Sequence, residues 1–582
     1  MKITSIFFLF ILYGCSKPMY DEKSNQLTVE GSQLVKDYII KQNKNKEIPD
    51  IKAKFGSNLR GLKLVGVDIS KADLSGIDLS FCEISRVNFS NSNLSNIILE
   101  KSVIQESDFS NTEMANLKAQ NIDVQASVFE NTKISYCDFT GSNFEDSDFT
   151  NAILESSVFE ESNLAKSIFQ GTKINNIRFQ QANLVNSSFK DSKIVNSSFY
   201  GADLRNMRGE KVNIKSCYFE SADLSFSSLS KAIIVNTDFT GAIINNSKIN
   251  ETNIKESIFP SGSFKYSNFA KSLILGCDFK NANFSNAILL QTEISNSTLN
   301  QTDFSNTQIN SLNVKNIKAG NLKFDKSTIS DVSISDSDLA HSSFSNANLD
   351  NLQINNSDLS NSDFINSNLK NCQFSKVKLA RMFVKNNNWQ RVKFLASPFE
   401  QVAMIDLNLE SFNLNNSPIT NSLLYKIGSI AGNAINSPAS RTIMIQIQGL
   451  DNIKSNTNIY VLKDLQNIKD LSNMNFQELN LAGYIFKQAN LSNANFKSAN
   501  LESAQLLSCL GTNADFSEAN LRNADLTGSV LTNSKFELAR LQFTNLNYTD
   551  IRQVDFSHSL IDKASFVNAK TDESTKIDYL TK

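Results

Sequence analysis

The chain of 582 residues is poor in the side chains that most often carry catalysis. It holds only two histidines, His341 and His558, and one tryptophan, Trp389. Neither histidine belongs to a Cys/His spacing typical of a metal site, and no phosphate-binding loop or nucleophile elbow appears. We therefore expect no enzyme activity, and neither a metal nor a cofactor. A carboxylate pair hidden among the many Asp and Glu residues is the alternative.

An excess of charge of either sign is also missing. The sequence has 57 basic and 59 acidic residues, a net charge of −2. Two local clusters stand out, an acidic stretch over 121–160 and a basic run over 376–393 around Trp389. Each wraps all faces of the structure inferred below, so both favour solvated belts over an anion or glycan site. We expect no nucleic-acid partner.

Long hydrophobic runs are absent except at the start. Ile3–Leu12 is apolar, follows Lys2, and is too short to span a bilayer. Leu12-Tyr13-Gly14-Cys15 resembles a bacterial lipobox, in which the cysteine is diacylated and becomes the first residue. The resemblance implies a lipid on Cys15, membrane attachment in the bacterial cell envelope and, from Ser16, sorting to the outer membrane. The alternative is an ordinary signal peptide or a buried apolar N-terminus.

What the sequence does have is a large apolar residue at every fifth position. One frame runs from Leu59 to Leu424, and a second from Phe476 to Phe566. The small exceptions are Ala119, Gly209, Ala319 and Gly511. If each such residue is a centre i, position i−2 is usually Ser, Ala or Thr, and positions i−1, i+1 and i+2 are mostly polar.

This period fits neither a helix nor a plain strand. Two inward residues separated by one outward residue form a short strand, and the two remaining polar residues form a corner. Repeated, this unit coils into a β-solenoid whose repeats contact mainly their neighbours. The first three exceptions support the packing, because large residues then occupy the i−2 slots: Leu117 and Ile122, Met207 and Val212, Ile317 and Leu322. Gly511 lacks such compensation, so we expect a local irregularity there.

The repeat resembles the pentapeptide-repeat family, whose consensus is A(D/N)LXX. The matching segments are Ala72-Asp73-Leu74-Ser75-Gly76, Ala222-Asp223-Leu224-Ser225-Phe226, Ala489-Asn490-Leu491-Ser492-Asn493 and Ala524-Asp525-Leu526-Thr527-Gly528. The resemblance implies an all-β fold, a right-handed quadrilateral β-helix with four pentapeptides per coil.

The chain is expected to divide into six segments. They are a lipoprotein signal peptide (1–15), a tether and capping helix (16–55), a first β-helix (56–424), a non-repeat spacer (425–472), a second β-helix (473–570) and a C-terminal tail (571–582). The capping helix is predicted over Gly31–Asn45 with Ser32 as N-cap. In the spacer, Ile443, Ile445 and Ile447 alternate as in a strand, and Leu462, Leu465, Ile468 and Leu471 suit a short amphipathic helix.

Six cysteines follow Cys15, and each occupies an i−2 slot: Cys82, Cys137, Cys217, Cys277, Cys372 and Cys509. They are predicted to be small buried side chains. Disulfides are the rival interpretation for an exported protein. With four repeats per coil, Cys217 lies roughly 19 Å from Cys137 and 14 Å from Cys277, beyond disulfide reach.

One outward cluster is a candidate partner-binding surface. It consists of exposed aromatic and arginine side chains on neighbouring coils: Tyr200, Tyr218, Phe226, Arg205 and Arg208. Exposed aromatics with arginine are typical of interface anchors, whereas scattered surface aromatics are also normal. The leading hypothesis is a non-enzymatic scaffold or protein-binding surface. The alternatives are a DNA mimic acting on a topoisomerase such as gyrase, and an enzyme with a site in the 425–472 insertion.

Overall fold

The computed structural model describes residues 19–410, 413–427, 439–440, 442–445, 459–460 and 468–577. The chain divides into two compact units, Met1–Thr298 and Leu299–Lys582. Within the described residues, no helix has the length and apolar character needed to span a bilayer. The expected fold class, an all-β quadrilateral β-helix preceded by a capping helix, is confirmed.

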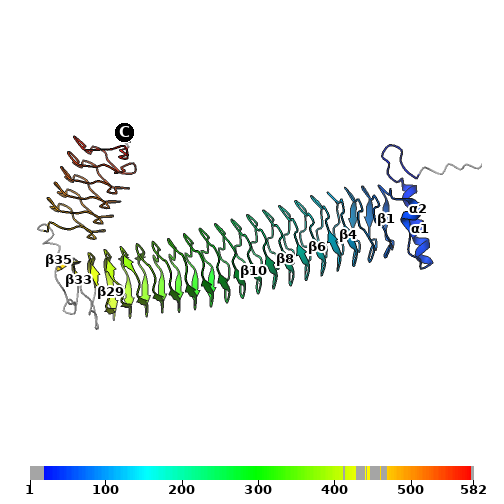
Figure 1. Ribbon diagram of the computed structural model, residues 1–582, viewed down its shortest axis with the longest axis horizontal. Coiled ribbons are helices and arrows are strands. Elements are labelled where there is room, and N and C mark those ends of the chain that lie inside the picture. The colour runs from blue at the N-terminus through cyan, green and yellow to red at the C-terminus, as the bar shows by residue number, and fades with distance from the viewer. Residues whose placement is uncertain are drawn as a thin grey trace, which may run out of the picture. The chain divides into compact units, whose positions relative to one another are not determined.

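Two helices precede the first coil in unit 1 (Figure 1): α1 (Val29–Lys44) and α2 (Ile51–Phe55). The expected N-cap was wrong. Thr28 caps α1, its Oγ1 accepting from the Gly31 N–H at 3.0 Å. Ser32 lies inside the helix, and its Oγ accepts from the Lys63 N–H of the first strand at 3.1 Å. The helix therefore satisfies a backbone donor that would otherwise face solvent at the solenoid end.

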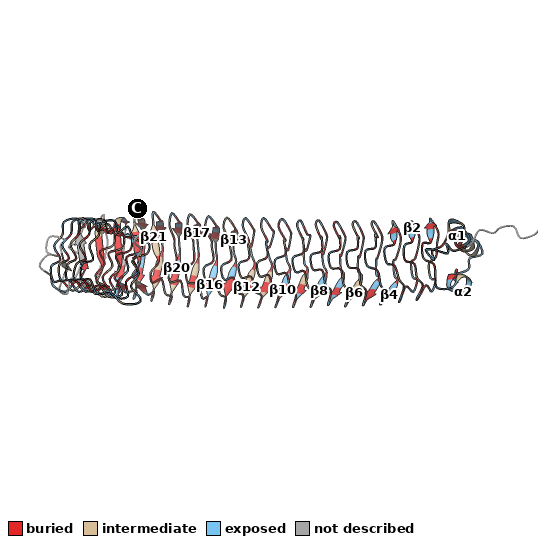
Figure 2. Cartoon of the chain, turned by 90° about the horizontal axis from the view of Figure 1, so that it is seen from above, coloured by how far each residue is buried: buried red, intermediate tan, exposed pale blue. Residues whose placement is uncertain are grey.

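The strands of unit 1 are three residues long, and the central residue of each is buried. They are β1 (Lys63–Val65), β2 (Glu83–Ser85), β3 (Val103–Gln105), β4 (Glu113–Ala115), β5 (Lys133–Ser135), β6 (Ile153–Glu155), β7 (Lys173–Asn175), β8 (Lys193–Val195), β9 (Asn213–Lys215), β10 (Ile233–Val235), β11 (Asn253–Lys255), β12 (Leu273–Leu275), β13 (Ile288–Leu290) and β14 (Glu293–Ser295). Figure 2 shows buried residues next to exposed ones in short strands such as β4 and β8.

Unit 2 continues the same construction with more strands. They are β15 (Gln308–Asn310), β16 (Asn313–Lys315), β17 (Thr328–Ser330), β18 (Ser333–Ser335), β19 (Asn348–Asp350), β20 (Gln353–Asn355), β21 (Asp363–Ile365), β22 (Asn368–Lys370), β23 (Gln373–Ser375), β24 (Leu379–Ala380), β25 (Phe383–Lys385), β26 (Asn388–Gln390), β27 (Lys393–Leu395), β28 (Phe399–Glu400), β29 (Ala403–Glu410), β30 (Asn413–Asn415), β31 (Ile419–Thr420), β32 (Leu423–Ile427), β33 (Ala439–Ser440), β34 (Thr442–Ile445) and β35 (Ile459–Tyr460). From residue 468 on, the second array pairs its coils through isolated bridges.

Neighbouring coils pair in parallel at an offset of 20 residues. In unit 1, Ile234 of β10 lies opposite Ile254 of β11; in unit 2, Ile334 of β18 lies opposite Ile354 of β20. The second array keeps this offset, as in Asn495↔Asp515. Since the repeat is five residues, each coil holds four repeats, the number that the family resemblance implied.

The centres form columns of stacked aromatic rings inside the coils. In unit 1 one column contains Phe199, Phe219 and Phe239, with ring centroids 4.5 and 4.8 Å apart. In the second array Phe496 and Phe516 are 5.0 Å apart. Parallel rings at this spacing pack apolar surface on both faces of each ring, so each column links the cores of the coils that contribute to it.

The corners explain the abundance of asparagine at i+2. Nearly every i+2 residue has a positive φ, for example Asn366 at 55° and Asn513 at 59°. Asparagine adopts this left-handed conformation more readily than other non-glycine residues. The side chains also bond along the stack, with Asn386 Nδ2 donating to Asn366 Oδ1 at 2.7 Å.

The exceptions to the frame pack in two ways. A Cβ added to Gly209 would lie 2.9 Å from Met207 Sδ, so Met207 occupies the space of the missing centre side chain, as expected. The irregularity expected at Gly511 was wrong. Its N–H donates to the Val530 carbonyl at 2.7 Å, as in regular coils, and Leu531 Cδ2 reaches to 3.0 Å from the missing Cβ.

Strand pairing extends past the end of the five-residue frame. β31 pairs with β33 and β32 pairs with β34, both at the 20-residue offset. The alternating strand predicted over Ile443–Ile447 is described as β34 up to Ile445. For the helix predicted over 462–471, residues 461–467 lie outside the described residues. Asp470 already pairs with Asn490 as part of the second array.

All six later cysteines are buried free thiols. Burial raises the pKa of Cys82 to about 12, and that of the others to about 11: Cys137, Cys217, Cys277, Cys372 and Cys509. Each Sγ lies near backbone carbonyls, as Cys137 Sγ does at 3.5 Å from the Met114 oxygen.

These thiols should not react with a disulfide reagent such as DTNB in the native protein at pH 8. Burial blocks access, and the raised pKa keeps the reactive thiolate scarce. Adding denaturant should release all six thiols together with the loss of β-structure, measured by absorbance and circular dichroism. Fast stoichiometric labelling of native Cys15→Ala protein would contradict the packing described here.

Candidate functional site

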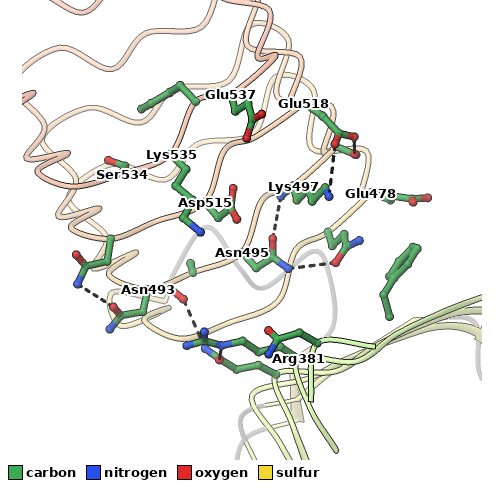
Figure 3. A pocket seen from close by; sticks show the side chains of 18 of the residues that line it. Arg381, Glu478, Asn493, Asn495, Lys497, Asp515, Glu518, Ser534, Lys535 and Glu537 are labelled. Atoms are coloured by element: carbon green, nitrogen blue, oxygen red, sulfur yellow. Dashed lines mark hydrogen bonds and ion pairs between the residues drawn. The ribbon is translucent and has the colours of Figure 1, made fainter. Parts of the chain in front are cut away.

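A polar cleft of about 1140 Å³ lies within unit 2, between the last coils of the first array and the second array. One wall contains a corner column spaced by 20 residues: Asn321, His341, Asn361, Arg381 and Gln401. The opposite wall contains the corner residues Asn493, Asn513, Asn533 and Gln553. Figure 3 shows Arg381 facing the side on which Asn493 and Asn495 lie.

The floor of the cleft is held by hydrogen bonds between the two arrays. Gln401 Nε2 donates to the Asn473 carbonyl at 2.7 Å, and Asn475 Nδ2 donates to the Gln401 carbonyl at 2.8 Å. Lys385 forms an ion pair with Glu478. These partly buried contacts position the walls against each other.

Most charged side chains of the second wall have a partner of opposite sign. Lys497 Nζ lies 3.4 Å from Glu518 Oε1, and Asp555 Oδ2 lies 2.9 Å from Lys576 Nζ. Asn495 Nδ2 donates to Gln477 Oε1 at 3.1 Å, and its own oxygen accepts from the Lys497 N–H (Figure 3). The wall therefore presents a network of amides and neutralised charges.

Asp363, on β21, is a cleft residue whose carboxyl is made much less acidic by its surroundings. Burial raises the pKa of its carboxyl to about 6. Among the nearby charges, Lys497 and His341 lower this pKa, whereas Asp325 and Glu478 raise it. Lys497 and Glu478 belong to the second array, so this carboxyl responds to both walls.

Replacing Asp363 by Asn should stabilise the protein at pH 7 but not at pH 4. The unfolded carboxyl ionises near 3.8. Since the native pKa is higher, the wild type is most stable below that value and loses stability as the pH rises to about 6. We expect a gain for Asp363→Asn on the order of 1–2 kcal/mol at pH 7, allowing for partial solvation. Urea unfolding of both proteins at pH 7 and pH 4 measures this gain. A stability difference between them that does not change with pH would contradict the raised pKa of Asp363.

Both histidines of the chain, His341 and His558, line this cleft. The sequence placed each at an outward corner but gave no sign that they share a site, because they belong to different arrays. In the described part of the chain, no group of three or more His, Cys, Asp or Glu side chains is arranged to hold a metal ion.

The predicted aromatic and arginine residues are exposed in unit 1 but occupy different sides of the coils. Tyr200 and Tyr218 are 47% and 52% exposed and flank the centres Phe199 and Phe219, which are stacked on one side. Phe226 is 60% exposed at a corner of the next side.

The two arginines lie apart from the tyrosine pair. Arg205 flanks Leu204 on the side next to the tyrosines, and Arg208 flanks Gly209 on the side after it. Asp203 holds Arg205, with its Oδ2 at 2.6 Å from Nη2. The structure therefore places Tyr200 and Tyr218 on the same side of neighbouring coils and spreads the other three residues over two further sides.

The tyrosine pair is bordered by charge along the stack. On one flank Arg178 pairs with Glu160 at 3.1 Å. On the other, burial and the neighbouring Asp238 carboxylate raise the pKa of Glu220. An acidic pair therefore stands beside two exposed aromatic rings.

Several charged side chains of the basic run and of the acidic stretch have partners on a neighbouring coil. Lys378 Nζ lies 3.0 Å from Asp358, Arg391 Nε donates to Asn371 at 2.6 Å, and Trp389 is buried as predicted. In the acidic stretch, Lys166 bridges to Glu145 at 2.8 Å. Cys15 and most of the 425–472 insertion lie outside the described residues.

Comparison with known proteins places the sequence among repeat proteins. A family model described as "Pentapeptide repeat region" matches 142–216 and 469–536. A second, described as "Pentapeptide repeats (8 copies)", matches 82–116, 212–259, 263–311, 329–364 and 342–381. No curated protein matches the chain.

Several solved structures are similar to parts of the chain. HetL, a pentapeptide repeat protein from Nostoc sp. strain PCC 7120, is 16% identical, with 43% of this chain and 92% of HetL covered and a TM-score of 0.19. QnrB1, a plasmid-mediated fluoroquinolone resistance protein, is 17% identical over 32% of this chain and 90% of its own, with a TM-score of 0.16. A pentapeptide repeat protein of the Arabidopsis thaliana thylakoid lumen is 37% identical over 16% and 69%, with a TM-score of 0.12.

Proposed function

Because the chain belongs to the pentapeptide-repeat family, we propose that it is a non-enzymatic scaffold, anchored in a bacterial envelope by a lipid on Cys15, that binds a protein partner through its solenoid surface. The single observation that carries the binding role is the exposed pair Tyr200 and Tyr218 on one side of unit 1. Exposed aromatic rings on a rigid support lose little conformational entropy on binding.

The surroundings of the pair indicate the chemistry of the partner. Glu220 lies two residues after Tyr218, and Asp238 lies one coil further along the same side. The mutual repulsion of these two carboxylates would be relieved by a basic group. A partner that offers an apolar pocket bordered by lysine or arginine therefore fits this surface.

The anchor rests on the sequence alone. The apolar run and Leu12-Tyr13-Gly14-Cys15 support lipidation and an outer-membrane location. Such an anchor would hold the scaffold at a membrane, away from DNA and its topoisomerases. The near balance of charge, with opposite charges paired across coils, likewise disfavours a DNA mimic.

The anchor is tested with labelled palmitate in cells. Wild-type protein should incorporate label and Cys15→Ala should not; acylation that survives the substitution would overturn the anchor. In the same cells, a photo-crosslinking amino acid at Tyr218 should trap one partner. The matched control is Tyr266, which is 59% exposed at a corner. Equal products from both positions would count against the tyrosine surface.

Assays on the purified protein test the two alternatives, the DNA mimic and the enzyme. Inhibition or protection of gyrase would favour the DNA mimic. Enzymatic turnover that is lost when 425–472 is deleted would favour the enzyme.

A further inference from the structure

We propose that the cleft of unit 2 binds an uncharged, hydroxyl-rich oligosaccharide laid along its amide columns. This site is separate from the tyrosine pair and goes beyond the proposed function. Its volume of about 1140 Å³ exceeds that of most single-ligand pockets, which hold about 300–1000 Å³, so it has room for several sugar rings.

The amide columns supply repeated hydrogen-bonding groups. Asn513 Nδ2 donates to Asn493 Oδ1 at 3.1 Å, and Asn533 Nδ2 donates to Asn513 Oδ1 at 2.7 Å. Asn513 thereby uses one of its two N–H donors and one of its two oxygen lone pairs within the column. The second N–H donor and the second oxygen lone pair of Asn513 remain for a ligand. Sugar hydroxyls suit them because a hydroxyl both donates and accepts.

The spacing of these groups suits a linear polymer. The column repeats once per coil, and the rings of Phe516 and Phe536 beneath the same wall are 5.1 Å apart. In an extended glycan each successive sugar presents its own hydroxyl groups at a comparable interval, about one sugar per coil. Asn321 and Asn361 add amides from the opposite wall.

The charges of the cleft favour a neutral ligand. Lys385 pairs with Glu478, Lys497 with Glu518, and Asp555 with Lys576. The other charged lining residues are of both signs, including Arg381 and Lys535 against Asp515 and Glu537. Neither a polyanion nor a polycation meets a surface of uniform opposite charge.

The walls also disfavour a peptide strand or a nucleic acid. The corner N–H groups already donate within the stack, from Asn493 to the Thr512 carbonyl and from Asn513 to the Thr532 carbonyl, so no open edge accepts an added strand. The lining residues Phe383 and Phe536 are buried, so neither phenylalanine ring offers a platform for stacking bases.

Binding by hydrogen bonds without an exposed aromatic ring should be weak, with a Kd on the order of 0.1–1 mM. Saturation-transfer NMR on the full chain in detergent can measure this. The probes are cello-, chito-, malto- and mannohexaose, with hexagalacturonate and hexaglucosamine as anionic and cationic comparators. We expect at least one neutral hexamer to bind and both charged hexamers to bind more weakly.

The matched variants are Asn513→Gly and Asn523→Gly. Both residues are corner asparagines with φ near 60°, so glycine preserves either fold, but only Asn513 lines the cleft. Asn513→Gly should weaken the neutral hexamer about tenfold, and Asn523→Gly should leave it unchanged. The proposal is overturned if no neutral hexamer binds, if a charged hexamer binds more tightly, or if the two variants behave alike. Tyr218→Ala should not alter this binding, which separates the cleft from the proposed partner surface.

Discussion

Replacing Phe219 by alanine is expected to destabilise the protein by about 3–5 kcal/mol. The ring is 1% exposed and stacks between Phe199 and Phe239, so its removal takes packing from both neighbouring coils. Because each coil is stabilised mainly by its neighbours, the loss should also split the unfolding of the array into two transitions. Urea denaturation followed by circular dichroism measures both effects.

The adjacent residue provides the control. Tyr218 has a side chain of similar size but is 52% exposed on the outside of the same coil. Tyr218→Ala should change the free energy of unfolding by no more than about 0.5 kcal/mol. If the two substitutions cost the same, the inward and outward assignments within the repeat are wrong.

In a double-mutant cycle, the losses of stability caused by changing Met207 and Gly209 singly should largely cancel when both residues are changed. Met207→Ala alone leaves a cavity and should cost about 2–4 kcal/mol, because Gly209 contributes no side chain to fill it. Gly209→Phe alone forces a ring into space that Met207 Sδ and Leu229 Cδ2 occupy, 2.9 and 3.2 Å from the added Cβ. Overpacking of this kind should cost at least about 1–3 kcal/mol.

Together the two changes should recover most of the lost stability. The double variant has a small i−2 residue and an aromatic centre, as at Phe189 and Phe199, and its new ring continues the column that ends at Phe189. We expect it to lie within about 1 kcal/mol of the wild type, a coupling well beyond the experimental error of such cycles. Additive losses in thermal or urea unfolding would show that the compensation is accidental.

The interior was predictable from sequence because one rule governs it everywhere. A centre such as Phe219 and a neighbour such as Met207 are identified by position alone, and each contact needs only the adjacent coil. Gly511 was mispredicted because its compensation comes from Leu531, a centre one coil away, rather than from the i−2 slot next to it.

The N-cap was mispredicted for a related reason. Thr28 and Ser32 are both competent capping residues, and the local sequence does not separate them. Ser32 does not cap the helix, because its hydroxyl accepts a hydrogen bond from the Lys63 N–H of the first coil. Only the folded chain supplies that partner.

The cleft could not be predicted from the pattern. Asn493 and Asn513 have the same sequence signature as corner asparagines elsewhere, such as Asn366 and Asn523. What distinguishes them is contact between arrays, as between Gln401 and Asn473. A link of irregular sequence separates those residues, so no periodicity relates one array to the other.

The 20-residue offset between coils has a consequence for how such a chain can change in length. Deleting one pentapeptide would leave the interior chemistry intact but rotate every later residue by a quarter turn about the axis. If the deleted repeat lay between Tyr200 and Tyr218, the two tyrosines would no longer share a side, and the column through Phe239 would meet a different set of centres. Deleting a full 20 residues, by contrast, restores the orientation. Insertions and deletions are therefore equivalent to rotations, and only whole turns preserve what one side of the protein presents.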